Sequence, residues 1–371
     1  MIKGRFNSFN SGRVNFFLLA VITVIIFASV LKIMAQVLLP FTVAVLLALV
    51  TSPTVRFLER FRIPRVVSAI FILLVIFGIL YAMGMILYTS GRTLLTLYPR
   101  YEVKIRGIYI QLARIFELPY DEYMTIFQNI WGQADIRTRV REMTLSFTNG
   151  FLSFLSVAFM VSIFMIFLLF EAVFLREKLD KAFEITRAER IKKISTGVIT
   201  QITHYLSVMF FVSLLNGALA GIGLAIIGVE FAAVWGVIQF VLNFIPNLGS
   251  IAAGIGATAF ALVQFWPNPE PIVATALVML GVNILCGFII MPKAMGDSLG
   301  LSPLVVLISL LIWGWLWGFA GLILAVPMTA IIKIVCENIS VLEPISVLMG
   351  SRKAVMAIKS EEEKPDLVNP D

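Results

Sequence analysis

Several amide and hydroxyl side chains lie within a long apolar stretch of the C-terminal half. They are Gln239, Asn243, Asn247, Ser250 and Asn283. Such groups donate and accept hydrogen bonds without carrying a net charge. This chemistry suits the binding of a small polyhydroxylated or dipolar molecule, and it does not suit covalent catalysis.

The backbone between these side chains is predicted to break. Pro246 lacks an N–H and blocks the helical bond to the carbonyl of Leu242, while Gly249 permits a tight path. A helix that starts near Ser250 would direct its positive end to the same place. We therefore predict a substrate site at Gln239, Asn243, Pro246, Asn247, Gly249, Ser250 and Asn283. The alternatives are that Asn247 and Ser250 only cap that helix, and that Asn283 only joins two helices.

Further interruptions of apolar segments predict hinges or gates. A membrane helix can be interrupted only where protein or a polar cavity provides hydrogen-bond partners for the exposed backbone groups. Transporters commonly have their binding sites at such breaks. The candidate hinge or gate residues are Pro292, Asp297, Gly318, Gly321 and Pro327. Asp297 either gates the cytoplasmic mouth or is simply solvated.

The sequence lacks the motifs of the common enzyme classes. It has no G-x-x-x-x-G-K-[ST] phosphate loop, no H-E-x-x-H pair and no G-x-S-x-G nucleophile turn. His204 is the only histidine, and the two cysteines, Cys286 and Cys336, lie in or beside apolar segments. We therefore predict no enzymatic activity, no cofactor and no metal site.

Composition places these residues in a membrane protein. Hydrophobic residues make up 60% of the 371 residues and charged residues only 14%, against about 25% in soluble domains. Apolar runs near 14–33, 38–56, 66–88, 150–172, 205–228, 231–265, 271–291 and 303–335 predict an all-α polytopic integral membrane protein with about eight membrane segments. The net charge of +7 arises from clusters flanking these runs, so the expected partners are a small-molecule or ion substrate and the lipid bilayer, not nucleic acid.

Basic loops set the expected orientation, with both termini in the cytoplasm of a multi-pass inner-membrane protein. The predicted regions are a three-helix membrane region (1–88), a largely helical extracytoplasmic insertion (89–149), a fourth membrane helix with a charged cytoplasmic helix (150–204), a transport core with broken helices (205–337) and a partly disordered cytoplasmic tail (338–371). The segments 231–265 and 303–335 are either re-entrant hairpins or full crossings. Both arrangements leave the two termini on the cytoplasmic side, so the distribution of charge does not distinguish them.

The C-terminal half resembles the AI-2E family of bacterial and archaeal transporters. The resemblance is carried by Trp235-Gly236, Asn243 to Ser250, Leu299 to Leu304, Trp313 to Gly318 and Ala325 to Thr329. It implies an inner-membrane permease with about eight membrane segments, and it makes a homo-oligomer plausible. Members are linked to export of the furanone signal autoinducer-2, and others to exchange of sodium or lithium for protons.

One departure from the family pattern favours an uncharged solute. Where relatives often have G-N-x-x-E-P, this chain has Gly287 to Pro292 with Phe288 and Met291 at the two polar positions. We therefore expect an exporter of a small polar organic solute, such as autoinducer-2, that works by alternating access. The alternatives are a monovalent cation/proton antiporter and a non-transporting membrane scaffold.

Overall fold

The structure, a computed structural model, describes residues 11–115, 156–171, 174, 178, 185–246, 248–295, 300–339 and 341–351. Within those ranges every regular element is a helix, apart from one isolated bridge between Leu301 and Gly350. The predicted all-α class is confirmed. In the described part of the chain, six helices are long and apolar enough to cross a membrane, so the predicted number of about eight segments is not confirmed. The six are Ala35–Glu59, Val67–Leu94, Thr196–Ile227, Leu248–Phe265, Pro269–Met295 and Pro303–Glu337.

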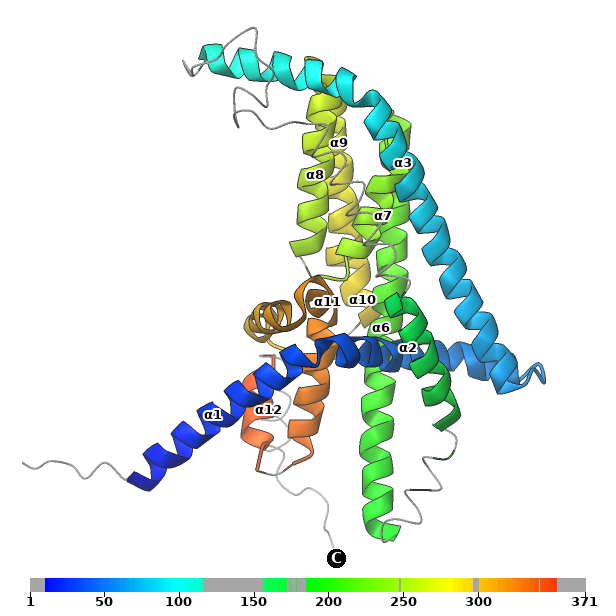
Figure 1. Cartoon of the computed structure of the whole chain (residues 1–371), viewed down its shortest axis with the longest axis vertical. Coiled ribbons are helices and arrows are strands. Elements are labelled where there is room, and N and C mark those ends of the chain that lie inside the picture. The colour runs from blue at the N-terminus through cyan, green and yellow to red at the C-terminus, as the bar shows by residue number, and fades with distance from the viewer. Residues whose placement is uncertain are drawn as a thin grey trace, which may run out of the picture. The chain divides into compact units, whose positions relative to one another are not determined.

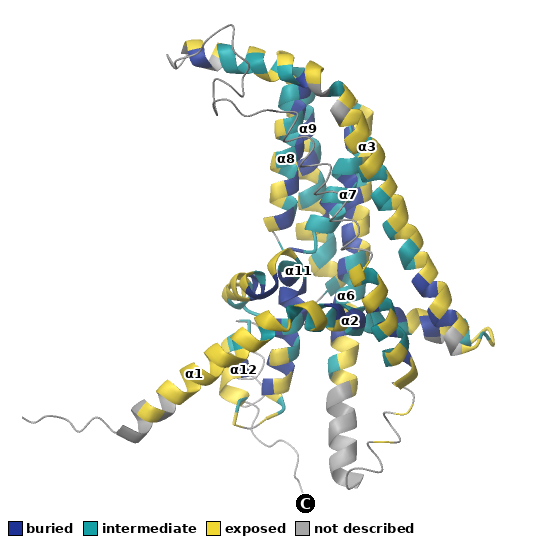
Figure 2. Cartoon of the chain, viewed as in Figure 1, coloured by how far each residue is buried: buried dark blue, intermediate teal, exposed yellow. Residues whose placement is uncertain are grey.

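The chain divides into two compact units. The smaller unit comprises Met1–Val45 and Leu301–Asp371, and the larger unit comprises Leu46–Gly300. Many described apolar side chains face outward, as in α1 (Ser11–Ile33), where Leu19 and Phe27 are each 63% exposed. Figure 2 shows this exposure along α1. In water such a surface would be unfavourable, so it indicates contact with lipid.

The larger unit packs four helices side by side (Figure 1). They are α6 (Ile185–Ile227), α7 (Ala232–Leu242), α8 (Leu248–Phe265) and α9 (Pro269–Ile284). The long helix α3 (Arg65–Ile115) contacts α7 and α8, and α2 (Ala35–Glu59) belongs partly to this unit. α3 continues through residue 88 without a break, and the predicted insertion beyond residue 115 lies outside the described residues.

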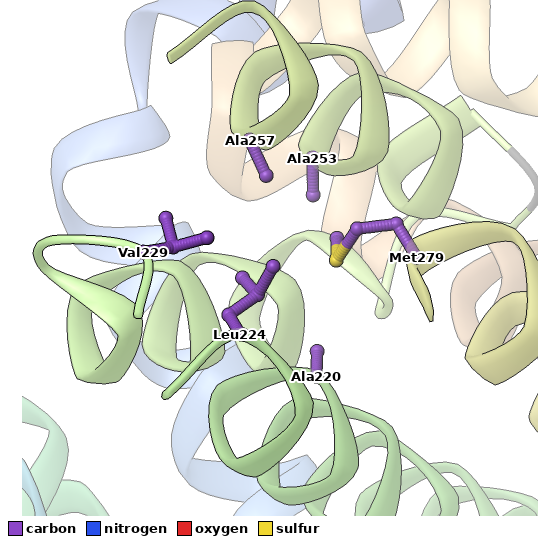
Figure 3. Close-up of a cluster of buried hydrophobic side chains, with 6 residues drawn as sticks. All are labelled: Ala220, Leu224, Val229, Ala253, Ala257 and Met279. Atoms are coloured by element: carbon purple, nitrogen blue, oxygen red, sulfur yellow. The ribbon is translucent and has the colours of Figure 1, made fainter. Parts of the chain in front are cut away.

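Small residues let these helices approach closely. Ala220 and Leu224 of α6 meet Ala253 and Ala257 of α8 and Met279 of α9 in a buried cluster (Figure 3). The approach of α6 to α7 is closer still. A Cβ atom on Gly217 would lie 2.6 Å from the carbonyl oxygen of Gly236, so any side chain there would push the two backbones apart.

The break predicted at Pro246 separates α7 from α8. The carbonyl of Leu242, which Pro246 cannot bond, accepts instead from the N–H of Ile245 at 2.9 Å. The chain then turns so sharply that a Cβ atom on Gly249 would lie 1.7 Å from the Leu242 oxygen. α7 has 11 residues and is about 16 Å long, which is too short to cross a hydrocarbon core of about 30 Å.

A π-helix, η1 (Leu285–Ile290), follows α9 and leads into α10 (Met291–Met295). Pro292 lies in α10, where it has no N–H to give to the preceding turn. π-helical turns are rare and are frequently found at functional sites. Here the π-helix begins two residues after Asn283, so it lies directly beside a predicted site residue.

The smaller unit contains α1, the long element α11 (Pro303–Glu337) and α12 (Glu343–Met349). α11 is bent at Trp317 and at Gly318, where φ is +61° and ψ is −139°. Trp313 Nε1 donates to Thr329 Oγ1 at 3.3 Å, although these residues would be about 24 Å apart in a straight helix. α11 therefore folds back on itself at the predicted break, like a hairpin.

The end of α1 is held against this bend. Trp317 Nε1 donates to the carbonyl of Leu31 at 3.2 Å, and the Lys32 ammonium lies 4.1 Å from the centre of the Trp315 ring. A cation near an aromatic face is attracted by the ring quadrupole. These contacts fix the tip of the α11 hairpin to the C-terminal end of α1.

We expect the Gly249→Ala substitution to prevent correct formation of the turn between α7 and α8. The added methyl group would overlap a backbone oxygen, which cannot move as a flexible side chain can. Gly281→Ala is the matched control, because a Cβ atom there meets nothing within 4 Å. Thermal unfolding of the purified variants should show a loss of several degrees or more for Gly249→Ala only; equal stability of the two variants would contradict the described turn.

Candidate functional site

A cluster of polar side chains joins the four central helices of the larger unit. α6 contributes two of them, α7 one, the residue after α7 another, and α8 and α9 one each. Its members are Ser213, Asn216, Gln239, Asn243, Ser250 and Asn283. Ser213, Asn216 and Gln239 are at most 1% exposed, so the cluster lies deep among apolar helices.

Gln239 lies at the centre of the cluster, on α7. Its Nε2 donates to Asn216 Oδ1 at 3.0 Å and to Asn283 Oδ1 at 2.6 Å. Asn283 Nδ2 donates in turn to the backbone carbonyl of Ser250 at 3.1 Å. α7 is thereby tied to α6 and α9, and α9 is tied to the first turn of α8.

Asn243 makes the remaining connections. Its Oδ1 accepts from Asn216 Nδ2 at 2.9 Å and from Ser250 Oγ at 2.8 Å, and its Nδ2 donates to Ser213 Oγ at 2.9 Å. Asn243 follows the last residue of α7, where the helix gives way to the turn at Pro246. The break in the backbone is thus held in place by side chains from α6 and α8.

One atom of the cluster has no partner. Gln239 Oε1 is buried and makes no hydrogen bond to any described residue. A buried oxygen left unpaired costs about 1–3 kcal/mol. A cluster that served packing alone would be expected to satisfy every member, because partly satisfied buried networks are unfavourable.

Most of the residues predicted to bind substrate come together here. Gln239, Asn243, Ser250 and Asn283 bond directly to one another or through a single neighbour, while Pro246 and Gly249 shape the turn between them. Asn247 lies outside the described residues. The Ser250 hydroxyl donates to Asn243 and can still accept a bond from a backbone N–H, so capping of α8 stays the alternative for Ser250. Whether these residues bind substrate stays a prediction.

Sequence reasoning missed Ser213 and Asn216. They lie three residues apart within the apolar run 205–228, a spacing that places both side chains on one face of a helix. A polar pair at helical spacing inside a membrane helix indicates a polar neighbour, and this pair can be recognised in the sequence. What the sequence could not supply was the rotation of α6 against α7, which the contact of Gly217 with Gly236 fixes.

The predicted hinge residues fall into separate groups. Pro292 follows the π-helix in the larger unit. Gly318, Gly321 and Pro327 belong to α11 in the smaller unit. Gly318 lies at its bend, and Gly321 lies where the returning chain passes so close to Trp313 that a Cβ atom would be 1.9 Å from the Trp313 carbonyl oxygen. Asp297 lies outside the described residues. The gating role of all five stays a prediction.

A second polar cluster holds α3 against the end of the four-helix group. Glu230 precedes α7, and its carboxylate pairs with Arg100 at 3.2 Å and accepts from the Tyr101 hydroxyl. The Gln264 side chain accepts from the N–H of Glu230 and donates to the carbonyl of Gly228, each at 2.8 Å.

Burial, together with the hydrogen bond and charge of Glu230, raises the pKa of Tyr101 above its usual range, so its hydroxyl remains a donor. The polar partners of Glu230 among the described residues are Arg100, Tyr101 and Gln264, so the carboxylate has a structural role in this second polar cluster.

Comparison with known proteins shows that the chain is similar to members of one transporter family. The profile of the AI-2E family transporter matches residues 16–340. The AI-2 transport protein TqsA of Escherichia coli K12 is 32% identical over 326 residues, which cover 85% of this chain and 90% of TqsA. A protein of Borreliella burgdorferi, named as a candidate transport protein, is 30% identical over 338 residues, or 91% of each chain. A similar candidate from Haemophilus influenzae is 30% identical over 331 residues.

We expect Asn283→Leu to loosen the attachment of α9 to α7 and α8. The change removes two hydrogen bonds, and bonds between membrane helices contribute about 0.6 kcal/mol each and at most about 1.7. Leu280→Ala, at a 57% exposed position of the same helix, is the control. Thermal unfolding in detergent should show a lower midpoint for Asn283→Leu than for the control. An unchanged midpoint would mean that the described bonds do not form.

Proposed function

This chain belongs to the AI-2E transporter family, and on that premise we propose that its polar cluster binds a small, uncharged, polar organic solute for transport. Membership of the family and several apolar helices make it a multi-pass inner-membrane transport protein. The observation that carries the proposal is the buried cluster of neutral amides and hydroxyls around Gln239.

The neutrality of the cluster favours an uncharged solute. All its side chains are amides or hydroxyls, and none of the buried described residues in the larger unit is Asp, Glu, Lys, Arg or His. An ion that entered such a site would lose its hydration without gaining an opposite charge, which is costly in an apolar interior. Hydroxyl and carbonyl groups on a solute would instead exchange bonds to water for bonds to amides.

The name of one relative supplies the first solute to test. TqsA is named as a protein of AI-2 transport, whereas the relatives from Borreliella and Haemophilus have names that state no solute. TqsA is 32% identical to this chain, so autoinducer-2 is the leading candidate for its solute.

The proposed mechanism is alternating access. Gln239 is fully buried in the described conformation, so solute can reach it only if the surrounding helices separate. The elements suited to that movement are the short helix α7, the turn at Pro246 and the π-helix after α9. The turn and the π-helix interrupt regular α-helical bonding, and Gly217 and Gly236 leave no side chains between α6 and α7 that would block a relative movement.

The antiporter alternative lacks a titratable group in the proposed site. A cation/proton antiporter needs such a group, deep in the membrane, that alternates between proton and cation. The buried charged residue among those described is Lys333, on α11 of the other unit, and its ammonium pairs with Glu337 at 2.7 Å. The cytoplasmic placement of both termini and any homo-oligomer stay predictions.

The test is saturable uptake of labelled autoinducer-2 by proteoliposomes that contain the purified full chain. We expect Asn243→Leu to reduce the flux at least tenfold, because it removes three hydrogen bonds at the centre of the site. Leu280→Ala should leave the flux unchanged, since that side chain is 57% exposed and takes no part in the cluster. Imposed proton and sodium gradients distinguish a coupled carrier from a facilitator.

Two outcomes would contradict different parts of the proposal. Flux equal to that of empty liposomes, with a folded and monodisperse protein, would overturn autoinducer-2 as the solute. Saturable flux that Asn243→Leu leaves unchanged would keep the solute and overturn the site. Ser250→Ala, which removes only one donated bond, serves as a second variant if Asn243→Leu does not fold.

A further inference from the structure

The unpartnered oxygen of Gln239 has a fixed direction in the cluster. Gln239 is 0% exposed, and the two hydrogens of its Nε2 are used by Asn216 and Asn283. Its Oε1 therefore points away from both neighbours and has no partner among the described residues. Amide oxygen and nitrogen have nearly the same size and shape, so the orientation of the Gln239 amide depends on its hydrogen-bond partners.

One backbone carbonyl excludes the reversed assignment. The carbonyl of Ser250 can only accept, so Asn283 must turn Nδ2 toward it and Oδ1 toward Gln239. Gln239 must then present Nε2 to Asn283. The same nitrogen also donates to Asn216, so Asn216 must accept with its Oδ1. Reversing Gln239 alone would set its oxygen against two other amide oxygens.

The rest of the cluster follows the same direction. Asn216, with Oδ1 toward Gln239, turns Nδ2 toward Asn243, so Asn243 must present Oδ1 there. Asn243 then has Nδ2 free to donate to Ser213. A continuous series of hydrogen bonds, all with determined directions, therefore connects the Ser250 carbonyl to Ser213. Gln239 Oε1 is the one side-chain amide oxygen of the cluster that this series leaves unmatched.

The other unpartnered buried atom in the described residues behaves differently. Ser68 Oγ, on α3, belongs to a hydroxyl, which can rotate about its C–O bond. Gln239 has no such freedom, because both of its donated bonds would break if the amide turned. The free acceptor is thus held rigidly at one place, which is the arrangement that gives a binding site selectivity.

We propose that Gln239 Oε1 accepts a hydrogen bond from a hydroxyl of the transported solute and determines the specificity of the site for hydrogen-bond donors. This inference rests on the proposed function, since it assumes that the cluster is the solute site. A solute that has an ether oxygen in place of this hydroxyl would be rejected by the site. A site built to bond a hydroxyl discriminates strongly against an analogue without it, because the buried oxygen is then left unpaired.

The experiment measures binding of autoinducer-2 and of derivatives in which one hydroxyl at a time is O-methylated, to the full chain in lipid nanodiscs. For the unaltered protein we expect one of the ethers to bind roughly tenfold to hundredfold more weakly than the parent. For Gln239→Met the ratio of the two dissociation constants should fall to about one. Asn216→Leu is the matched control, because it removes two bonds of the cluster but leaves Gln239 Oε1 available.

A merely structural role of Gln239 would give a different result. Gln239→Met would then weaken parent and ethers equally and leave their ratio unchanged, which would overturn the inference. Equal binding of parent and all ethers by the unaltered protein would also overturn it, even if Gln239→Met failed to fold. In both cases the proposed function would stand. Absence of saturable autoinducer-2 binding to the unaltered protein would overturn this inference together with the leading solute.

Discussion

The hydrogen bond from Asn283 Nδ2 to the carbonyl of Ser250 is the contact on which the polar cluster depends. A backbone carbonyl has no choice of role, whereas each side-chain amide can present either end. Once α9 bonds to this carbonyl, the directions of Asn283, Gln239, Asn216 and Asn243 are determined in sequence. A backbone group beside a helix break thus sets the polarity of side chains on three other segments.

Close backbone packing makes this arrangement possible. Amides on α6 and α7 can meet only if the helices nearly touch, and Gly217 and Gly236 provide that approach at the level of the cluster. Near the other end of α7, Gly249 lets the chain return against the Leu242 carbonyl. Glycine is usually unfavourable in helices because of its conformational freedom. Here the lost helical stability is offset by hydrogen bonds and packing between neighbouring segments.

The sequence predicted the breaks better than it predicted the partners. Pro246 and the pair Gly318 and Gly321 could be identified because proline lacks a donor and glycine lacks a Cβ atom, properties that need no knowledge of the fold. Four amide or hydroxyl residues of the cluster were recognised by their polarity in an apolar run. To predict that Ser213 and Asn216 join the cluster, one must know how α6 is rotated about its axis, and that rotation depends on contacts remote in sequence. The second polar cluster was equally hidden, because Arg100, the cation that pairs with Glu230, lies 130 residues earlier, on α3.

The π-helix after Asn283 makes the larger unit sensitive to changes in chain length. A π-helical turn holds about one residue more than an α-helical turn, so residues 285–290 contain one residue that regular winding would not need. Its deletion would restore α-helical bonding and leave the hydrophobicity of the segment unchanged. It would also rotate everything beyond it by about 100° relative to Asn283. Among relatives, gain or loss of one residue here would therefore be a change of geometry at the polar cluster, even where every aligned side chain is identical.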